Sequence, residues 1–327
     1  MAFIPAHPEV ESGGEMNSRP QENEKAGDTV PKSGLAGIFL NPWVLLALAG
    51  LFWSGNHIAA RAGAGHVPPM GLASLRWLLA AAILWPFVRN HVRRDMPAVL
   101  LGWKPILALS VIGGAIFSAL QYTALQYTTA LNASIFNSFA PAIIVLVGAV
   151  LFGDRLRPVN LAGIAISFAG VIIIVSRGDL GVLKTISFNY GDVLLLLNMA
   201  VWALYSTSLR MRPKVHPLTF TFFLVLVAGV TLIPFWIWEH VHGYHMQASG
   251  LTLAVLAYVT IFPGILSYLC WNRGIEAVGA ARGGVFLHLI PFYGAVLATL
   301  LLGEKLMGFH IAGCALIIAG VWFAAKK

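Results

Sequence analysis

Hydrophobic positions in this chain form long runs, separated by short stretches of charged, proline or glycine residues. Arg93 and Arg94 mark one such break, and Asp154 and Arg155 mark another. A helix needs ~20 mostly apolar residues to cross the hydrocarbon core of a bilayer, and runs of that length recur along most of the chain. The pattern predicts ten membrane-spanning helices, at about residues 42–61, 69–89, 104–126, 129–151, 158–176, 190–210, 217–239, 250–274, 281–302 and 308–325.

The chain contains an internal repeat, in which residues 141–170 match residues 291–320 at a constant offset of 150 without a gap. The first spans of the two halves also match, at an offset of 149. Duplicated helical membrane proteins are typically transporters, with the substrate site between the halves. The coinciding positions include Pro141 and Pro291, Gly153 and Gly303, Asp154 and Glu304, Gly163 and Gly313, and Gly170 and Gly320.

The composition also indicates a membrane protein. Hydrophobic residues make up 58% of the chain and charged residues only 10%, whereas soluble chains average ~25% charged. The net charge of +8 does not predict nucleic-acid binding, because the basic residues lie in short loops between apolar runs. Residues 1–40 are polar and without periodicity, so we expect a disordered cytoplasmic tail there. No grouping of cysteine or histidine resembles a metal site, and we expect neither a metal nor another cofactor.

Lys and Arg are distributed unequally between alternate loops. With the N-terminus in the cytoplasm, sixteen of them fall on the cytoplasmic side and four on the other. Positive residues favour the cytoplasmic side, so both termini are predicted to be cytoplasmic. Five spans per half is an odd number, and residues 188–327 would therefore enter the membrane inverted relative to residues 41–178. The predicted fold is an all-α integral membrane protein of two inverted five-helix repeats.

Polar and aromatic residues share one face of the first span in each half. Trp53, Asn56 and His57 fall on one face, and Trp202 and Tyr205 fall on the matching face of the sixth span. Polar groups are costly in hydrocarbon unless they face protein or water. These faces are therefore predicted to line a central cavity. The alternative is that the tryptophans only pack and that Asn56 and Tyr205 bridge neighbouring helices.

Prolines occupy matching positions in the fourth and ninth spans. Inside a helix, Pro141 and Pro291 would each remove one backbone hydrogen bond and free the carbonyl four residues earlier, which in the fourth span is that of Asn137. Ser138 and His288 lie beside the freed carbonyls. Interruptions at matching positions indicate a binding site, so we predict that Asn137, Ser138 and His288 contact substrate and that the prolines act as hinges. The alternative is a kink that only shapes packing.

Arg76 lies well inside a span, where its charge must face the protein interior or extend toward the surface. It could be the counter-charge for a substrate carboxylate, or a structural partner of backbone carbonyls. His57 and His288 are candidates for carrying a coupling proton or for hydrogen-bonding a neighbouring helix. Tyr122 belongs to a set of aromatic residues that would suit the cavity to an apolar or aromatic solute.

Several motifs resemble those of a known family. Over residues 42–325 the chain resembles the drug/metabolite transporter superfamily in its ten-helix EamA-type branch, and within it the YddG-type aromatic amino-acid exporters. The resemblance implies an inverted-repeat carrier in the bacterial inner membrane that exports small metabolites, with spans 5 and 10 peripheral to the cavity. The motifs are Trp53-Ser54-Gly55-Asn56, Ala59-Ala60-Arg61, Leu75-Arg76-Trp77, Tyr122-Thr123-Ala124-Leu125, and the twin endings at 151–156 and 301–306.

The leading hypothesis is a secondary transporter that exports small metabolites by alternating access, with amino acids, especially aromatic and neutral ones, as the substrates. Its expected partners are a small-molecule substrate and the lipid bilayer, with the chain acting as a monomer. A sugar-phosphate or nucleotide-sugar exchanger of the same fold would need more than one buried cation. The remaining alternatives are a passive channel and an intramembrane enzyme that uses Ser54 and His57.

Overall fold

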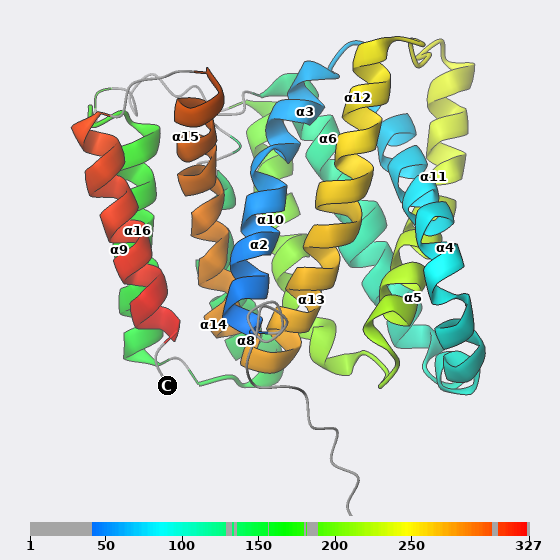
Figure 1. Cartoon of the computed structure of the whole chain (residues 1–327), viewed down its shortest axis with the longest axis horizontal. Helices are drawn as coiled ribbons and strands as arrows, with labels where there is room; N and C mark the ends of the chain where they lie inside the picture. The colour runs from blue at the N-terminus through cyan, green and yellow to red at the C-terminus, as the bar shows by residue number, and fades with distance from the viewer. Residues whose placement is uncertain are drawn as a thin grey trace, which may run out of the picture.

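The computed structural model describes residues 41–128, 133, 136–155, 157–179, 181, 189–302 and 307–325. All regular structure within these residues is helical, and the helices run side by side between two faces (Figure 1). The predicted tail at 1–40 and the loop holding Glu304 and Lys305 lie outside the described residues. In chain order the elements are α2 (Pro42–Ser54), α3 (Asn56–Ala62), α4 (Pro69–Leu101), α5 (Trp103–Ser110), η1 (Val111–Ile116), α6 (Phe117–Tyr127), α8 (Ala140–Phe152), α9 (Pro158–Val175), α10 (Tyr190–Ser208), η3 (Leu209–Met211), α11 (Pro217–Val241), α12 (Gly250–Val259), η4 (Thr260–Leu266), α13 (Ser267–Val278), α14 (Ala280–Gly283), η5 (Gly284–His288), α15 (Leu289–Leu302) and α16 (Gly308–Ala325).

Seven helical stretches among the described residues are long and apolar enough to cross a membrane. They correspond to the predicted spans 1, 2, 3, 5, 6, 7 and 8. The fourth and tenth predicted spans fall on the shorter apolar helices α8 and α16. The ninth falls on α14, η5 and α15, which follow one another without a gap. The long stretches are Pro42–Ala60, Pro69–Leu101, Trp103–Tyr127, Pro158–Val175, Tyr190–Met211, Pro217–Val241 and Gly250–Val278.

The second span continues further than the sequence pattern predicted. Its helix α4 ends at Leu101, not near residue 89, and the charged residues Arg93, Arg94 and Asp95 are part of it. Charged side chains mark where a helix leaves the hydrocarbon, but Arg is itself a good helix former. The helix is instead capped by Gly102, whose N–H donates to the carbonyl of Ala98. The charged break therefore did not mark the end of the helix.

Helices α9 and α16 pack so closely that their backbones touch. A Cβ atom on Gly163 would lie 2.6 Å from the carbonyl oxygen of Gly320, and one on Gly170 would lie 2.6 Å from that of Gly313. The earlier glycine of α9 thus meets the later glycine of α16, and the later one meets the earlier. The two helices therefore cross antiparallel. Small residues allow this approach in membrane bundles. Elsewhere α4 packs on α11, α2 on α13, and α10 on α6.

Replacing Gly320 with alanine is expected to destabilise the protein, because the added methyl group would lie 2.5 Å from the Gly163 carbonyl oxygen. Overpacking of this kind costs about 1–3 kcal/mol. The matched control is Gly294→Ala, within α15, where an added Cβ meets nothing within 4 Å. Thermal unfolding in detergent should show a lower midpoint for Gly320→Ala and an unchanged or higher one for Gly294→Ala. Equal midpoints would contradict the close crossing.

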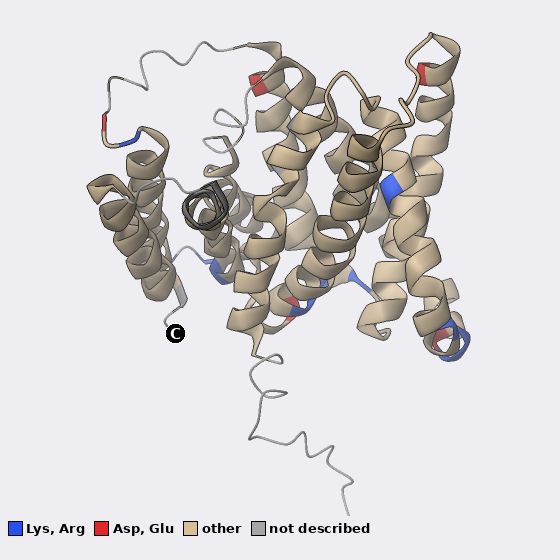
Figure 2. Ribbon diagram, turned by 45° about the horizontal axis from the view of Figure 1, so that its top comes forward, with Lys and Arg blue, Asp and Glu red and all other residues tan. Residues whose placement is uncertain are grey.

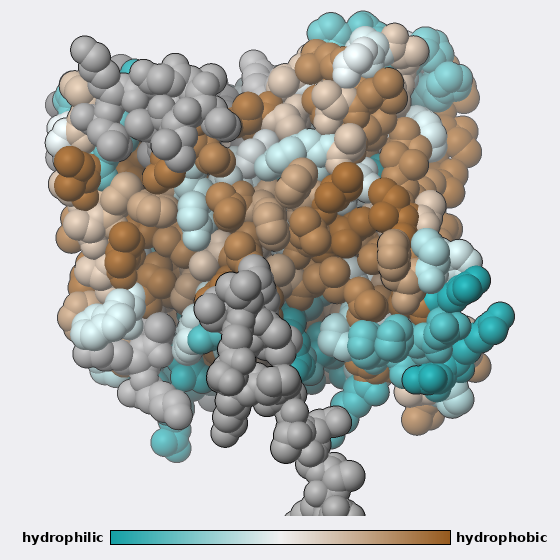
Figure 3. All heavy atoms as spheres, in the orientation of Figure 1, coloured by the Kyte–Doolittle hydropathy of each residue, from teal (hydrophilic) through white to brown (hydrophobic). Residues whose placement is uncertain are grey.

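The surface separates into an apolar middle and polar ends. In Figure 3 hydrophobic residues cover the middle height of the molecule and hydrophilic ones gather toward the upper and lower edges. Side chains such as Phe87 and Leu146 are more than half exposed, as expected where lipid is the solvent. Most of the described Lys and Arg residues lie toward the lower end, where the described C-terminal end also lies (Figure 2).

An ion pair joins the loop after α8 to the end of the sixth span. Asp154 accepts hydrogen bonds of 3.0 and 2.5 Å from the guanidinium of Arg210. These bonds hold the pKa of Asp154 below its ordinary value. The carboxylate therefore stays charged through neutral and mildly acidic pH, and the pair is lost only as the pH falls through that lowered pKa. Gly153 makes the turn possible by adopting a left-handed conformation with φ 66°.

Candidate functional site

A cavity lies at the centre of the bundle, where both halves of the chain meet. Its empty space is about 490 Å³, of which the centre of a water-sized molecule can reach only about 40 Å³. A cavity needs roughly 10–15 Å³ of such space for each water, so in this conformation the cavity would hold a few waters. The residues that line it are Trp53, Asn56, Arg76, Phe117, Gln121, Asn137, Ala140, Met199, Trp202, Tyr268, Leu287 and Ile290.

The lining brings together five of the residues singled out in the sequence: Trp53, Asn56, Arg76, Asn137 and Trp202. They come from α2, α3, α4, the short helical segment at 136–137 before α8, and α10. The other predicted residues occupy different positions. Tyr122, Tyr205, Ser138 and His288 are not among the lining residues, and the side chain of His57 lies outside the described part of the chain.

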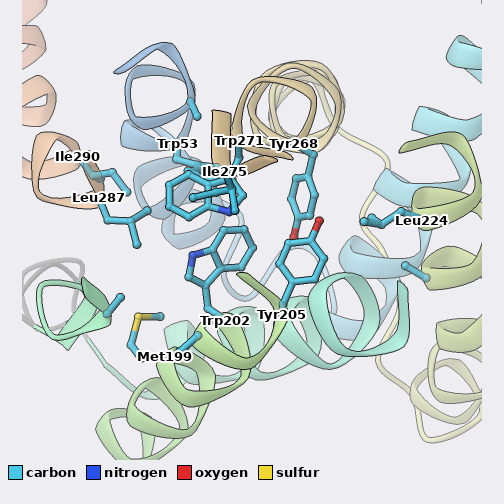
Figure 4. Close-up of a cluster of buried hydrophobic side chains, with 14 of the residues drawn as sticks. Trp53, Met199, Trp202, Tyr205, Leu224, Tyr268, Trp271, Ile275, Leu287 and Ile290 are labelled. Carbon is cyan, nitrogen blue, oxygen red and sulfur yellow. The ribbon is translucent and has the colours of Figure 1, made fainter. Parts of the chain in front are cut away.

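Aromatic rings form one wall of the cavity. The rings of Trp53 and Trp202 meet edge to face with their centroids 5.1 Å apart, and Phe117 lies 4.8 Å from Trp202. Tyr268 and Trp271 of α13 pack against the same pair of tryptophans. Figure 4 shows the rings of Trp53, Trp202, Tyr268 and Trp271 gathered between α2, α10 and α13, with Tyr205 beside Trp202. Edge-to-face rings pack tightly and give a rigid apolar surface.

Sequence analysis missed Tyr268 and Gln121 as lining residues. Tyr268 comes three residues before Trp271, so the two rings share a helical face. Gln121 is an amide in the middle of an apolar run, which is the same signal that identified Asn56. In both cases the signal was present, but only the packing of the helices shows which face of each span turns inward.

Arg76 is buried beside the cavity, with 2% of its surface exposed. Its guanidinium donates to the hydroxyl of Tyr122 at 2.7 Å and to that of Ser118 at 2.8 Å. It also lies over the ring of Trp77, with its central carbon 4.0 Å from the ring centroid. Trp77 donates to Ser118 as well, at 3.0 Å. Helix α6 therefore holds the guanidinium in place through two neutral hydroxyl groups, and Trp77 of its own helix α4 packs against it.

No carboxylate among the described residues forms an ion pair with Arg76. The ion pairs in that part of the chain join Arg210 to Asp154, and Arg212 and Arg273 to Glu276. The Nε atom of Arg76 is buried without a hydrogen-bond partner. A buried cation without a counter-charge is strongly unfavourable, and Arg76 is among the residues that line the cavity.

A tyrosine–asparagine hydrogen bond, here called a polar tie, occurs in both halves of the chain. The tyrosine lies at the third-span position in one half and at the first-span position in the other. The hydroxyl of Tyr122 donates to Asn56 at 3.2 Å, and the hydroxyl of Tyr205 donates to Asn272 at 2.6 Å. Asn56 and Tyr205 are the equivalent residues of the first and sixth spans, 149 positions apart. Asn272, which sequence analysis did not single out, lies 150 positions after Tyr122. Each tie joins the first span of a half to its third.

Each of the two prolines lies in the first turn of an α-helix. Helix α8 begins at Ala140, directly before Pro141, and α15 begins at Leu289, two residues before Pro291. N–H groups in the first turn of a helix have no intrahelical partner, so Pro141 removes no hydrogen bond within α8. The kink and the hinge role of the two prolines stay predictions. The irregular backbone lies just before each proline, in the turn at 138–139 and in η5.

His288 joins two elements outside the cavity lining. Its Nε2 donates to the backbone carbonyl of Ser138 at 2.8 Å, and its Nδ1 lies 2.6 Å from the hydroxyl of Ser167 on α9. The imidazole is fully buried. Within the described residues no cluster of histidine, cysteine, aspartate or glutamate has the arrangement of a metal site.

The sequence was compared with known proteins. It is 31% identical to a protein of Archaeoglobus fulgidus described as an uncharacterized transporter, over 87% of this chain and 97% of that one. It is 27% identical to a probable amino-acid metabolite efflux pump of Salmonella typhimurium, over 85% and 92%. It is 24% identical to a probable terminal-alkyne amino-acid exporter of Streptantibioticus cattleyicolor, over 87% and 93%.

The fold also has a solved counterpart. One crystal structure superposes with a TM-score of 0.69 at 20% sequence identity, covering 86% of this chain and 96% of that one. The EamA-like transporter family matches the chain twice, over residues 41–176 and again over residues 189–325. The chain is therefore a multi-pass membrane protein that belongs to the EamA-like transporter family.

Proposed function

We propose that this protein is a secondary transporter that exports small metabolites carrying a carboxylate, with neutral and aromatic amino acids as its substrates. The single observation that carries the proposal is the buried guanidinium of Arg76, which has no described counter-ion and lies beside an aromatic-lined cavity. Relatives named as amino-acid metabolite efflux pumps and as an amino-acid exporter support the substrate class.

Each group of the substrate has a proposed partner in the cavity. The carboxylate would bind Arg76, since a planar guanidinium matches a carboxylate in both charge and shape. The side chain would lie against Trp53 and Trp202. The amides of Asn56 and Asn137 would orient the remaining polar groups. We propose that His57, Tyr122, Ser138, Tyr205 and His288 contact the substrate in other states of the cycle or hold the residues that do.

We propose ten spans, arranged as two inverted repeats at 41–178 and 188–327. Three observations support this arrangement: the antiparallel crossing of Gly163 and Gly170 with the equivalent residues of α16, the exchanged tyrosine–asparagine ties, and the positions of η1 and η4, two π-helical segments about 150 residues apart. Segments related by such a repeat give two equivalent arrangements, each open to one side.

Alternating access is the mechanism that the size of the cavity favours. The space that water-sized molecules reach, about 40 Å³, is too small for an amino acid. The helices must therefore separate to admit the substrate. We propose that Pro141 and Pro291 lie at the hinges, because the backbone before each of them departs from the α-helix in the described residues.

We propose that the protein lies in the bacterial inner membrane as a monomer, with both termini in the cytoplasm. The gathering of basic residues at one end of the bundle supports this orientation (Figure 2). A sugar-phosphate exchanger ranks lower, because Arg76 is the one cation among the described lining residues. A channel or an enzyme finds less support in the family match.

Counterflow in proteoliposomes tests the proposed function. Vesicles that hold the purified chain and are loaded with unlabelled phenylalanine should accumulate labelled phenylalanine from outside at equal pH. Loading with tyrosine or tryptophan should also drive uptake, and loading with lysine or with a hexose phosphate should not. Accumulation that is driven by the hexose phosphate and by no carboxylate would contradict the proposal, and non-saturable equilibration would indicate a channel. Vesicles without protein are the control.

A further inference from the structure

We infer that the cavity selects its substrates by net charge, and that it prefers apolar monoanions without a free ammonium group to the corresponding zwitterionic amino acids. The preferred class would contain N-acylated, 2-hydroxy and 2-oxo relatives of neutral amino acids. This inference rests on the proposed function, since it assumes that a carboxylate binds beside Arg76. It adds that no carboxylate in the described lining compensates a positive charge on the same substrate.

The distribution of acidic residues is the first argument. Among the described residues no aspartate or glutamate lines the cavity, and each of the six acidic side chains is engaged elsewhere. Glu239 accepts from the backbone N–H groups of Met70 and Gly71 at the start of α4. Asp192 accepts from Thr128 and caps the start of α10. The other four are Asp95 with His216, Asp154 with Arg210, Asp179 with Gly181, and Glu276 with Arg212 and Arg273.

The hydrogen-bond donors of the lining are the second argument. Nε of Arg76 and Nε1 of Trp202 are both buried donors without an acceptor. Figure 4 shows the ring nitrogen of Trp202 turned away from Tyr205, toward the side where Met199 and Leu287 lie, and both of these residues line the cavity. Unpaired buried donors are unfavourable, and their natural partners are the oxygen atoms of an anion.

Two amide oxygens of the lining already accept hydrogen bonds. Oδ1 of Asn56 accepts from the hydroxyl of Tyr122, and Oε1 of Gln121 accepts from the amide of Asn198. The lining therefore combines one formal positive charge with two unpaired donors. It is built for an acceptor-rich ligand with a single negative charge.

The electrostatic consequence separates the two classes of substrate. In an amino acid bound through its carboxylate, the ammonium group is attached to the next carbon and stays close to the guanidinium. Like charges repel strongly in a medium of low dielectric constant, and the ammonium would also lose its water shell without gaining a counter-ion. Acylation or replacement of the amino group removes both penalties. A dianion would instead carry a second charge with no partner.

A matched ligand series on the full chain in proteoliposomes tests the inference. The measured quantity is the concentration of each compound that halves counterflow of labelled N-acetylphenylalanine. We expect N-acetylphenylalanine and phenyllactate to act at concentrations at least tenfold lower than phenylalanine, and phenylalanine amide not to compete. If phenylalanine competes as well as its acetylated form, charge selection is refuted, while the proposed carrier stands. If no carboxylate is transported or competes, the proposed function itself fails.

Replacing Gln121 with glutamate gives the reciprocal test, because it places a carboxylate in the lining with little change in shape. This variant should lose affinity for N-acetylphenylalanine and gain affinity for phenylalanine, which reverses the order of the two ligands. Asn56→Asp is a second variant with the same logic, since the aspartate still accepts from Tyr122. An unchanged order in a folded variant would overturn the inference.

Discussion

Replacing Arg76 with glutamine is expected to abolish transport and to leave the folded protein almost as stable as before. In the cavity its guanidinium is the one charge available to a substrate carboxylate among the described lining residues. Loss of one partner of a buried charge pair costs about 2–5 kcal/mol. With about 1.4 kcal/mol per factor of ten, this corresponds to a decrease in apparent affinity of roughly 30-fold or more.

The stability of this variant distinguishes a binding role from a structural one. Glutamine removes a buried charge without a counter-ion, which is a gain in stability. It also loses the hydrogen bonds to Tyr122 and Ser118, which contribute about 0.5–1.5 kcal/mol each. These effects nearly offset one another, so the unfolding midpoint in detergent should change little.

Two further variants complete the experiment. Arg76→Lys keeps the charge but lacks the planar fork, so it should bind more weakly than the native protein and better than Arg76→Gln. Arg273→Gln removes an exposed partner of Glu276 and should leave transport unchanged. A large drop in stability of Arg76→Gln with normal transport in the surviving protein would show that the guanidinium has a structural role only.

Replacing Trp202 with phenylalanine is expected to raise the half-saturation concentration about tenfold without loss of the folded state. The indole Nε1 is a buried donor without a partner beside the cavity. A hydrogen bond from it to an anionic group would contribute about 1.5–3 kcal/mol. Phenylalanine retains a ring against Trp53 and Phe117 and loses this donor.

The choice of phenylalanine matters because Trp202 is also a packing residue. Truncation to alanine would leave a void among five neighbouring rings, and such truncations cost about 3–5 kcal/mol. Lost activity in Trp202→Ala would therefore not separate binding from folding. Equilibrium binding and counterflow kinetics on Trp202→Phe measure the binding role directly.

Trp271→Phe is the matched control for this experiment. Trp271 belongs to the same cluster and is fully buried, but it is not among the lining residues, and its Nε1 donates to Ser206 at 3.3 Å. We expect this variant to lose some stability and to keep the native half-saturation concentration. The same rise in both variants would mean that the cluster acts only through its packing, and the role assigned to the Trp202 donor would then be wrong.

The sequence by itself determined the class of the protein and most of its long helices. Runs of about 20 apolar residues are typical of helices that cross a bilayer. Seven of the predicted spans lie in helices long enough to cross a membrane. The family motifs around Trp53 and Arg76 were recognisable because they are local. The same reasoning found five of the lining residues, since polar groups within apolar runs must face protein or water.

Only the tertiary structure decided which charged side chains are paired and which residues line the cavity. Whether Arg76 has a counter-ion depends on residues that α6 and α13 bring beside it, at least 40 positions away in the chain. His288 and Arg76 look alike in sequence, as single titratable groups in apolar spans, yet the first is tied to Ser138 and Ser167 and the second faces the cavity. The end of α4 was also not predicted, because Arg93 and Arg94 are charged and yet lie within the helix. Hydrophobicity reports the solvent around each segment, whereas charge pairing and cavity lining arise only from the packing of distant helices.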